Sequence, residues 1–189
     1  VTVSNAPPTA DAGGPYSGEQ FADIILDGSG SSDPGGDPLT YAWDLNNDGN
    51  FDDAAGVTAT FNSATTGDFT VGLQVTDDDG ASDSTTTIVT VGNAAPIADA
   101  GPDQSGISQG ATVTLDGSAS SDPSGDPLTY AWTLASVPTG SAAVLSDATA
   151  VGPTFVADLP GTYVAELVVN DGTSDSAPDT VTVTVGEAS

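Results

Sequence analysis

The stretch "SGSSDPGGDPLTYAW" at residues 29–43 returns as "SASSDPSGDPLTYAW" at residues 118–132, at an offset of 118 minus 29, or 89 residues. Two flanking stretches repeat in the same order: "NAPPTADAG" from Asn5 matches "NAAPIADAG" from Asn93, and "FTVGLQVTDDDG" from Phe69 matches "YVAELVVNDG" from Tyr163. The offsets of these two stretches are 93 minus 5, or 88, and 163 minus 69, or 94 residues. Matches in the same order at such similar offsets indicate repeated structural units. The sequence therefore predicts two copies of one domain, at residues 5–92 and 93–189.

A third repeated feature marks the junctions between units. The sequences "VTVSN" at 1–5, "VTVGN" at 89–93 and "VTVGE" at 183–187 are variants of one motif. We therefore expect residues 1–4 to be the last-strand remnant of a preceding repeat, and the chain to be part of a longer array. The same remnant, Val1 to Val3, could also pair with the sheet edge of a neighbouring molecule in a filament.

Apolar side chains alternate with polar ones along the repeated stretch. One face of the first copy carries Leu39, Tyr41, Trp43 and Leu45, and one face of the second carries Leu128, Tyr130, Trp132 and Leu134. A period of two predicts strands with one buried face. Short strands separated by Gly, Pro, Asp and Ser turns predict an all-β chain of two tandem immunoglobulin-like antiparallel β-sandwiches.

The two tryptophans allow two interpretations. An exposed tryptophan could serve as a platform for a sugar ring, whereas a tryptophan on the apolar face of a strand belongs to the core. Trp43 and Trp132 occupy equivalent positions on the apolar face. We expect both to be buried.

The charge of the chain excludes several classes of partner. It has 27 acidic residues and no Lys, Arg or His, which gives a formal net charge of −27. Phosphate groups need basic side chains, so nucleic acid and anionic lipid are excluded as partners. No apolar run is long enough to span a membrane, so we expect no membrane insertion. Without cysteine there is no disulfide and no thiolate metal site.

Catalysis has few suitable residues. Without His, Cys or Lys, a serine nucleophile has no ordinary general base. Most aspartates recur between the two copies at turn positions, which indicates a structural role rather than one active site. We expect that the chain is not an enzyme.

The ordered motifs "NAPPTADAG", "LDGSGSSDPGGDPLTYAWD" and "FTVGLQVTDDDG" resemble the PKD (polycystic kidney disease) type domain. The second copy, with "LTYAWTLASVPTGSAAVLS", resembles the longer PKD-like variant of bacterial surface proteins. The resemblance implies an immunoglobulin-like sandwich used as an extracellular spacer or adhesion module. It also implies a cell-surface location, and we expect a prokaryotic source.

The resemblance further implies calcium at the start of each unit. Some family members hold the ion through the opening Asn, the next backbone carbonyl, the Asp of the SxDP turn and an Asp of the VTD turn. The matching positions are Asn5, Ala6, Asp33 and Asp77 in the first unit, and Asn93, Ala94, Asp122 and Asp171 in the second. An ion that joins the segment between domains to the turns of the following domain would fix the interdomain angle. The alternative is that these side chains only shape their own turns.

A separate stretch, "DLNNDGNFDD" at residues 44–53, resembles the first half of an EF-hand calcium loop. Its candidate ligands are Asp44, Asn46, Asp48, Asn50, Asp52 and Asp53. The twelfth position is Ala55, so the bidentate glutamate is missing. The alternative is a solvated acidic hairpin. The second unit has Thr133 in place of Asp44 and lacks the loop.

Together these features favour a calcium-rigidified structural spacer or stalk in a large secreted or cell-surface protein, such as an adhesin or an extracellular fibre. Its partners would be neighbouring repeats of the same chain or fibre. The alternative is a ligand-binding module for polysaccharide or a fibrous surface protein. Exposed aromatic side chains on a strand face would favour that alternative.

Overall fold

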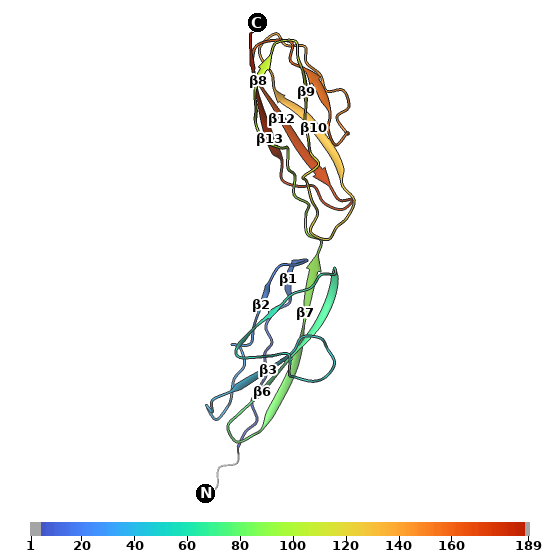
Figure 1. The fold of residues 1–189 in the computed structure, drawn as a ribbon. Helices are drawn as coiled ribbons and strands as arrows, with labels where there is room; N and C mark the ends of the chain where they lie inside the picture. Colours follow the sequence, from blue (N-terminus) through green and yellow to red (C-terminus); the bar gives the residue numbers. More distant parts are fainter. Residues whose placement is uncertain (1–4, 188–189) are drawn as a thin grey trace. The chain divides into compact units, whose positions relative to one another are not determined.

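The computed structural model describes residues 5–187, and these residues form strands and no helix (Figure 1). The prediction of an all-β chain is confirmed. The chain divides into two compact units between Asn93 and Ala94, called unit 1 and unit 2 below. The predicted remnant at residues 1–4 lies outside the described residues. In the described part, no helix is long and apolar enough to cross a membrane.

Unit 1 is a sandwich of a large and a small sheet. The large sheet has the order β1-β7-β6-β3-β4, and β2 pairs with β5 in the small sheet. The strands are β1 (Tyr16–Glu19), β2 (Ile24–Asp27), β3 (Thr40–Asp44), β4 (Ala54–Ala55), β5 (Thr58–Phe61), β6 (Gly67–Thr76) and β7 (Ser82–Gly92). Both sheets supply the core, because Leu26 and Phe61 of the small sheet share one buried cluster with Trp43, Leu73 and Val89 of the large one.

Unit 2 has the same arrangement without a counterpart of β4. Its large sheet has the order β10-β12-β13-β8, and β9 pairs with β11. The strands are β8 (Gln104–Ser108), β9 (Thr112–Thr114), β10 (Thr129–Ser136), β11 (Thr154–Val156), β12 (Gly161–Asn170) and β13 (Asp179–Gly186). Val113 and Phe155 of the small sheet pack in one cluster with Trp132, Leu167 and Val183 of the large sheet.

The sheets are not purely antiparallel. The first strand of each unit runs parallel to the last one: β1 pairs with β7 from Tyr16 opposite Val89, and β8 pairs with β13 from Gln104 opposite Val183. Alternation within a strand fixes which side chains face the core, but it carries no information on the direction of the neighbouring strand. The prediction of antiparallel sheets therefore holds for the other pairs and missed these two.

The repeated strand has the predicted orientation. Trp43 is 0 % and Trp132 is 2 % exposed, so both belong to the core and neither offers a platform for a ligand. Leu39, Tyr41 and Leu45 pack against the core of unit 1 as predicted. Asp44 is the exception, because it lies on the opposite face of β3 and is still only 3 % exposed.

Candidate metal-binding turns

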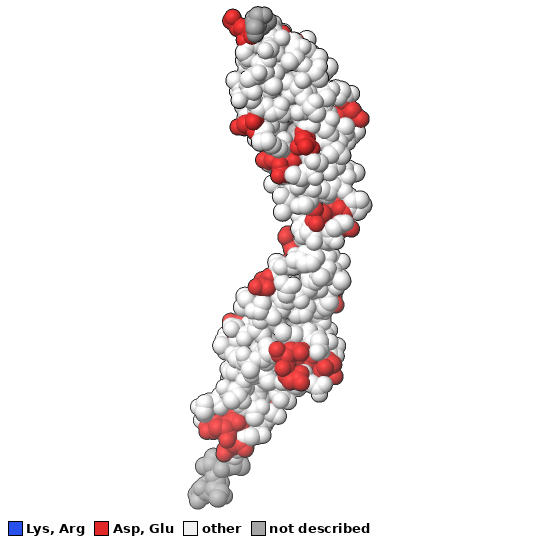
Figure 2. All heavy atoms as spheres, viewed as in Figure 1, with Lys and Arg blue, Asp and Glu red and all other residues white. Residues whose placement is uncertain are grey.

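Acidic side chains form separate patches on the visible surface, and no basic residue lies between them (Figure 2). The carboxylates of the described residues therefore find their partners among N–H and O–H donors. A carboxylate oxygen that lacks such a donor cannot be compensated by a basic side chain, because the chain has none.

In unit 1, the Asp33 carboxylate shapes the turn that precedes β3. Its Oδ1 accepts hydrogen bonds from the backbone N–H of Gly35 at 2.6 Å and of Asp37 at 3.1 Å. Its Oδ2 is buried and has no hydrogen-bond partner. One oxygen thus holds the turn, and the other remains available to a ligand that is not part of the chain.

Asn5 and Asp77 are brought together, as the predicted site requires. The Asn5 Nδ2 donates to Asp77 Oδ2 at 2.8 Å, and the backbone N–H of Ala81 donates to Asp77 Oδ1 at 2.8 Å. Asp77 is 4 % exposed. The hydrogen bond from Asn5 is the main cause that lowers the pKa of Asp77 below its ordinary value, against the opposing effect of burial. Ala6, whose carbonyl is the fourth predicted ligand, is half-buried.

Asp122 of unit 2 has the same hydrogen-bond arrangement as Asp33 of unit 1. Its Oδ1 accepts from the backbone N–H of Ser124 at 2.9 Å and of Asp126 at 3.1 Å, and its Oδ2 is buried without a partner. The hydrogen bond from the Ser124 side chain is the main cause that lowers the pKa of Asp122, and the charge of Asp171 acts in the opposite direction. Asp171 is 8 % exposed, and its Oδ1 accepts from the N–H of Thr173 at 2.6 Å.

The two remaining predicted ligands of the second site fall on the division between the units. Asn93 is the last residue of unit 1, and Ala94, which is 6 % exposed, is the first residue of unit 2. Within unit 2, the predicted ligands that lie in turns are Asp122 and Asp171. They match Asp33 and Asp77 of unit 1 in burial and in accepting hydrogen bonds from backbone N–H groups.

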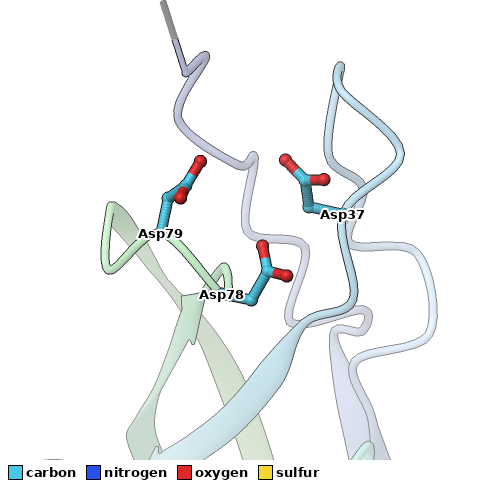
Figure 3. Close-up of side chains that lie close together, drawn as sticks. All are labelled: Asp37, Asp78 and Asp79. Carbon is cyan, nitrogen blue, oxygen red and sulfur yellow. The ribbon is translucent and has the colours of Figure 1, made fainter.

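Three further carboxylates of unit 1 were missed in the sequence. Asp37 precedes β3, Asp78 and Asp79 lie in the turn between β6 and β7, and each offers an oxygen within 4.8 Å of the other two (Figure 3). Burial is the main cause that raises the pKa of Asp37, and the charges of Asp78, Asp33, Asp79 and Asp77 act in the same direction. The cluster is particular to unit 1, because Gly172 and Thr173 of unit 2 follow Asp171 where Asp78 and Asp79 follow Asp77.

In the predicted EF-hand-like loop, the carboxylates hold the loop itself. Asp44 Oδ2 accepts from the N–H of Gly49 at 2.9 Å, Asn46 Oδ1 from that of Asp48 at 2.8 Å, and Asp48 Oδ1 from that of Asn50 at 2.8 Å. Asp53 Oδ2 accepts from the N–H of Leu45 at 2.7 Å. Among the described residues, the carboxylates of Asp44, Asp48, Asp52 and Asp53 form no cluster as close as that of Asp37. Calcium in this loop stays a prediction.

The loop is fixed to the sheet by Phe51. A Cβ placed on Gly72 of β6 would lie 3.0 Å from the Phe51 ring and 3.4 Å from the Asp44 Cβ. The missing side chain of Gly72 therefore makes room for Phe51, and the folded loop covers Asp44. In the repeat alignment Glu166 takes the place of Gly72, which agrees with the absence of the loop from unit 2.

Comparison with known proteins assigns the family. Residues 5–91 match the PKD domain family, and residues 100–185 match the K319L-like PKD domain family. Both units are PKD domains. The PKD family is a non-catalytic module. That the chain is not an enzyme stays a prediction.

The relatives are much longer proteins. Human dyslexia-associated protein KIAA0319 is 30 % identical over 167 residues, which are 85 % of this chain and 15 % of that protein. Chitinase A of Pseudoalteromonas piscicida is 35 % identical over 141 residues, or 70 % of this chain and 16 % of the chitinase. The chain thus spans about a sixth of the length of these relatives. Among solved structures, the PKD1 domain of Vibrio anguillarum Epp has a TM-score of 0.40 and 26 % identity, covering 48 % of this chain and all (100 %) of that domain.

Proposed function

We propose that this PKD pair is a calcium-stiffened spacer segment of a large secreted or cell-surface protein, such as an adhesin or an extracellular fibre. Its PKD membership supports a modular, non-catalytic role. The small share that the chain makes up of its relatives, 15 % and 16 %, supports the view that such modules serve within much longer proteins.

One observation carries the calcium part of the proposal. Asp33 Oδ2 and Asp122 Oδ2, at the same point of the two repeats, are both buried without a hydrogen-bond donor. A buried carboxylate oxygen costs free energy unless a donor or a cation compensates it. The chain has no Lys, Arg or His to do so. Calcium prefers carboxylate, amide and backbone oxygens, and the turn offers Asp33 and Asp77 together with the Asn5 segment.

The link between calcium and stiffness comes from Asn5. This residue lies on the segment that opens unit 1, and it already donates to Asp77 at 2.8 Å. An ion that takes Asp33, Asp77 and an oxygen of the opening segment holds this segment to the turns of the unit. The repeat alignment gives Asn93 the same place at the start of the second PKD domain. The ions would then restrict the motion of each opening segment.

The first test is thermal unfolding of the whole chain in calcium and in chelator. At a calcium concentration about ten times the Kd, one site adds about 1.4 kcal/mol, and a domain of this size gains about 4–8 °C per kcal/mol. Asp33→Asn and Asp122→Asn should each reduce the calcium-dependent gain, because each removes the charge of the buried oxygen. Glu19→Gln removes the same charge from an exposed position and is the matched control.

An unchanged midpoint in calcium would rule out the proposed sites. If Glu19→Gln and Asp33→Asn lose the same part of the calcium-dependent gain, calcium stabilises the chain by general charge screening and not by binding at Asp33. Magnesium at the same concentration distinguishes a specific calcium site from charge screening. It demands a stricter octahedral geometry and gives up its water reluctantly, so a specific calcium site should respond to it less than to calcium.

The second test concerns stiffness. Because the chain has no cysteine, Thr86→Cys and Thr184→Cys allow one spin label on an exposed position of each unit. The distribution of label distances should be narrow in calcium and broad in chelator. Equal widths in both conditions would refute the spacer mechanism even if calcium binds.

The alternative of a ligand-binding module is not supported by the tryptophans. Both tryptophans are buried, at 0 % and 2 % exposure, so neither can stack on a ligand. Another part of the surface of unit 1 carries a separate argument for a ligand, and it does not depend on calcium.

A further inference from the structure

Unit 1 has an open groove between the Asp44–Asp53 loop and the strands β5 and β6. Its volume is about 490 Å³, and it is lined in part by Asn46 and Asn47 of the loop, by Asn62 after β5 and by Asp68 and Phe69 of β6. A second hollow of about 420 Å³ continues it and shares Asn46, Phe61 and Asn62. Ligand sites in proteins have volumes of roughly 300–1,000 Å³.

The floor of the groove is aromatic. The rings of Phe61 and Phe69 lie with their centroids 5.3 Å apart and are tilted by 52°. Phe61 is 5 % exposed and belongs to the core, whereas Phe69 is half-buried. Phe21 stands beside the groove, since its N–H donates at 2.9 Å to the carbonyl of the lining residue Ser63. Phe21 as a whole residue is 46 % exposed, and every other aromatic residue among the described ones is buried or half-buried.

The rim carries neutral and acidic groups that have hydrogen-bonding capacity left. The Asn47 side chain makes no hydrogen bond within residues 5–187, and its backbone has a φ of 58°. Asn62 donates to Asp23 at 3.1 Å through Nδ2, which leaves Oδ1 as an acceptor. Asp68 accepts from Thr90 through Oδ1 at 2.8 Å, which leaves Oδ2. The rim therefore offers both donors and acceptors.

The chemistry of the groove selects among ligand classes. A phosphate, sulfate or uronate ligand finds no Lys, Arg or His anywhere in the chain and meets a net charge of −27. A purely apolar ligand would leave the amide groups of the rim desolvated and unpaired. Sugar hydroxyls both donate and accept hydrogen bonds, and the C–H face of a sugar ring is suited to the ring of Phe69. We propose that this groove binds a neutral oligosaccharide.

This site would give the spacer a second role, and it does not rest on the calcium proposal. It is also confined to unit 1, because Thr133 replaces Asp44 in unit 2 and the loop that forms one wall is missing. Unit 2 therefore serves as a control within the same molecule.

The test is a titration of the whole ¹⁵N-labelled chain, followed by NMR, with soluble cello-, xylo- and chito-oligosaccharides. Alginate oligosaccharides serve as the anionic control. At least one neutral series should shift the side-chain amide signals of Asn47 and Asn62 in a saturable way, and it should leave the signals of unit 2 in place. The proposal is overturned if no neutral oligosaccharide gives saturable shifts up to about 10 mM, if the shifts map outside the groove, or if alginate binds equally well.

Variants then test the contacts. Asn47→Gly removes the amide and keeps a residue that tolerates the positive φ, and Asn62→Ala removes the second amide. Each should weaken binding about tenfold, the effect of one lost hydrogen bond. Ser84→Ala is the control, because it removes an exposed hydrogen-bonding group of unit 1 that does not line the groove. Thermal midpoints show that each variant is folded, and wild-type affinity in both Asn47→Gly and Asn62→Ala would refute the proposal.

Discussion

Unit 1 and unit 2 place a tryptophan at the same point of the same strand but surround it differently. In unit 1 the Trp43 Nε1–H donates to the Gly56 carbonyl at 3.0 Å. In unit 2 the Trp132 Nε1 is buried without a hydrogen-bond partner. The apolar burial is shared, whereas the polar group of each ring depends on loops that the two units do not have in common.

The surroundings of the core differ in the same sense. Unit 1 has the Asp44–Asp53 loop, fixed by Phe51 above Gly72. Unit 2 has a network in which the buried Tyr163 hydroxyl donates to Asp158 at 2.9 Å, while the Ser141 hydroxyl donates to the same carboxylate. Phe69 of unit 1 matches Tyr163 in the repeat and has no hydroxyl. The two units thus share one type of apolar core but surround it with different local interactions.

The largest expected effect is that of Gly72→Glu, which gives unit 1 the residue of unit 2. The new side chain displaces Phe51 and adds a carboxylate beside the buried Asp44. We expect unit 1 to lose about 3 kcal/mol of stability. Urea unfolding followed by hydrogen exchange reports each unit separately. The reverse change, Glu166→Gly, should cost unit 2 about 1 kcal/mol or less, and equal costs would show that Gly72 does not make room for the loop.

Tyr163→Phe should have the next largest effect. The hydroxyl donates to Asp158, accepts from the backbone N–H of Leu159, and is fully buried. Its loss removes one donor to the half-buried Asp158, leaves the Leu159 N–H without its acceptor, and should cost unit 2 about 2 kcal/mol. Tyr130→Phe removes the hydroxyl of a half-buried tyrosine of unit 2 and should cost less than about 0.5 kcal/mol. If the two variants lose the same stability, the hydrogen-bond network around Asp158 does not stabilise unit 2 more than the hydroxyl of Tyr130 does.

The tryptophan pair gives a smaller difference. Trp43→Phe leaves the Gly56 carbonyl without its donor, whereas Trp132→Phe removes an indole N–H that was already unpaired. We expect Trp43→Phe to cost about 1–2 kcal/mol more than Trp132→Phe. Each variant retains one tryptophan, so its fluorescence reports the unfolding of the unmutated unit, and hydrogen exchange reports the other. A larger cost for Trp132→Phe would contradict the comparison.

Acid should weaken the network of unit 2. The hydrogen bond from Ser141 is the main cause that lowers the pKa of Asp158, followed by that from the Ala142 N–H. A carboxyl group whose pKa is lowered on folding adds stability above its unfolded pKa of about 4, and loses it as the pH falls through the folded value. In chelator, the stability gap between the wild type and Asp158→Asn should therefore narrow below about pH 4. A gap that stays constant from pH 7 to pH 3 would exclude this role.

The smallest effect concerns the turn before the second strand of each unit. Phe21 has a φ of 63°, and Gly110, at the same place in unit 2, has a φ of 83°. A left-handed conformation costs a residue with a side chain roughly 1–2 kcal/mol. Phe21→Gly should therefore stabilise unit 1 by up to about 1 kcal/mol, and Gly110→Ala should destabilise unit 2. A loss of stability in Phe21→Gly would show that the exposed ring makes packing contacts that outweigh the strain.

The sequence predicted the core well, because alternation and repetition both report burial directly. It could not predict the burial of Asp44, since that depends on a loop folding back over the strand. The exchange of Gly72 for Glu166 was a readable signal, but its meaning depends on knowing that Phe51 reaches β6.

The acidic residues show a similar limit. Asp33 and Asp77 were predicted from the family motif, and the structure joins Asn5 to Asp77 by a hydrogen bond. Asp37 and the pair Asp78 and Asp79 come together from turns far apart in the chain. Only the folded sheet shows that "DPGGDP" and "DDDG" lie side by side.

The parallel pairing of the first and last strands of each unit has a mechanical consequence. In unit 1, β1 runs beside β7 over four residue pairs, from Tyr16 opposite Val89 to Glu19 opposite Gly92. Tension applied to the two ends of a unit pulls such strands in opposite directions along their length. The hydrogen bonds between them then bear the force together in shear and do not open one after another. A module built in this way is expected to resist stretching more strongly than one whose end strands separate one hydrogen bond at a time.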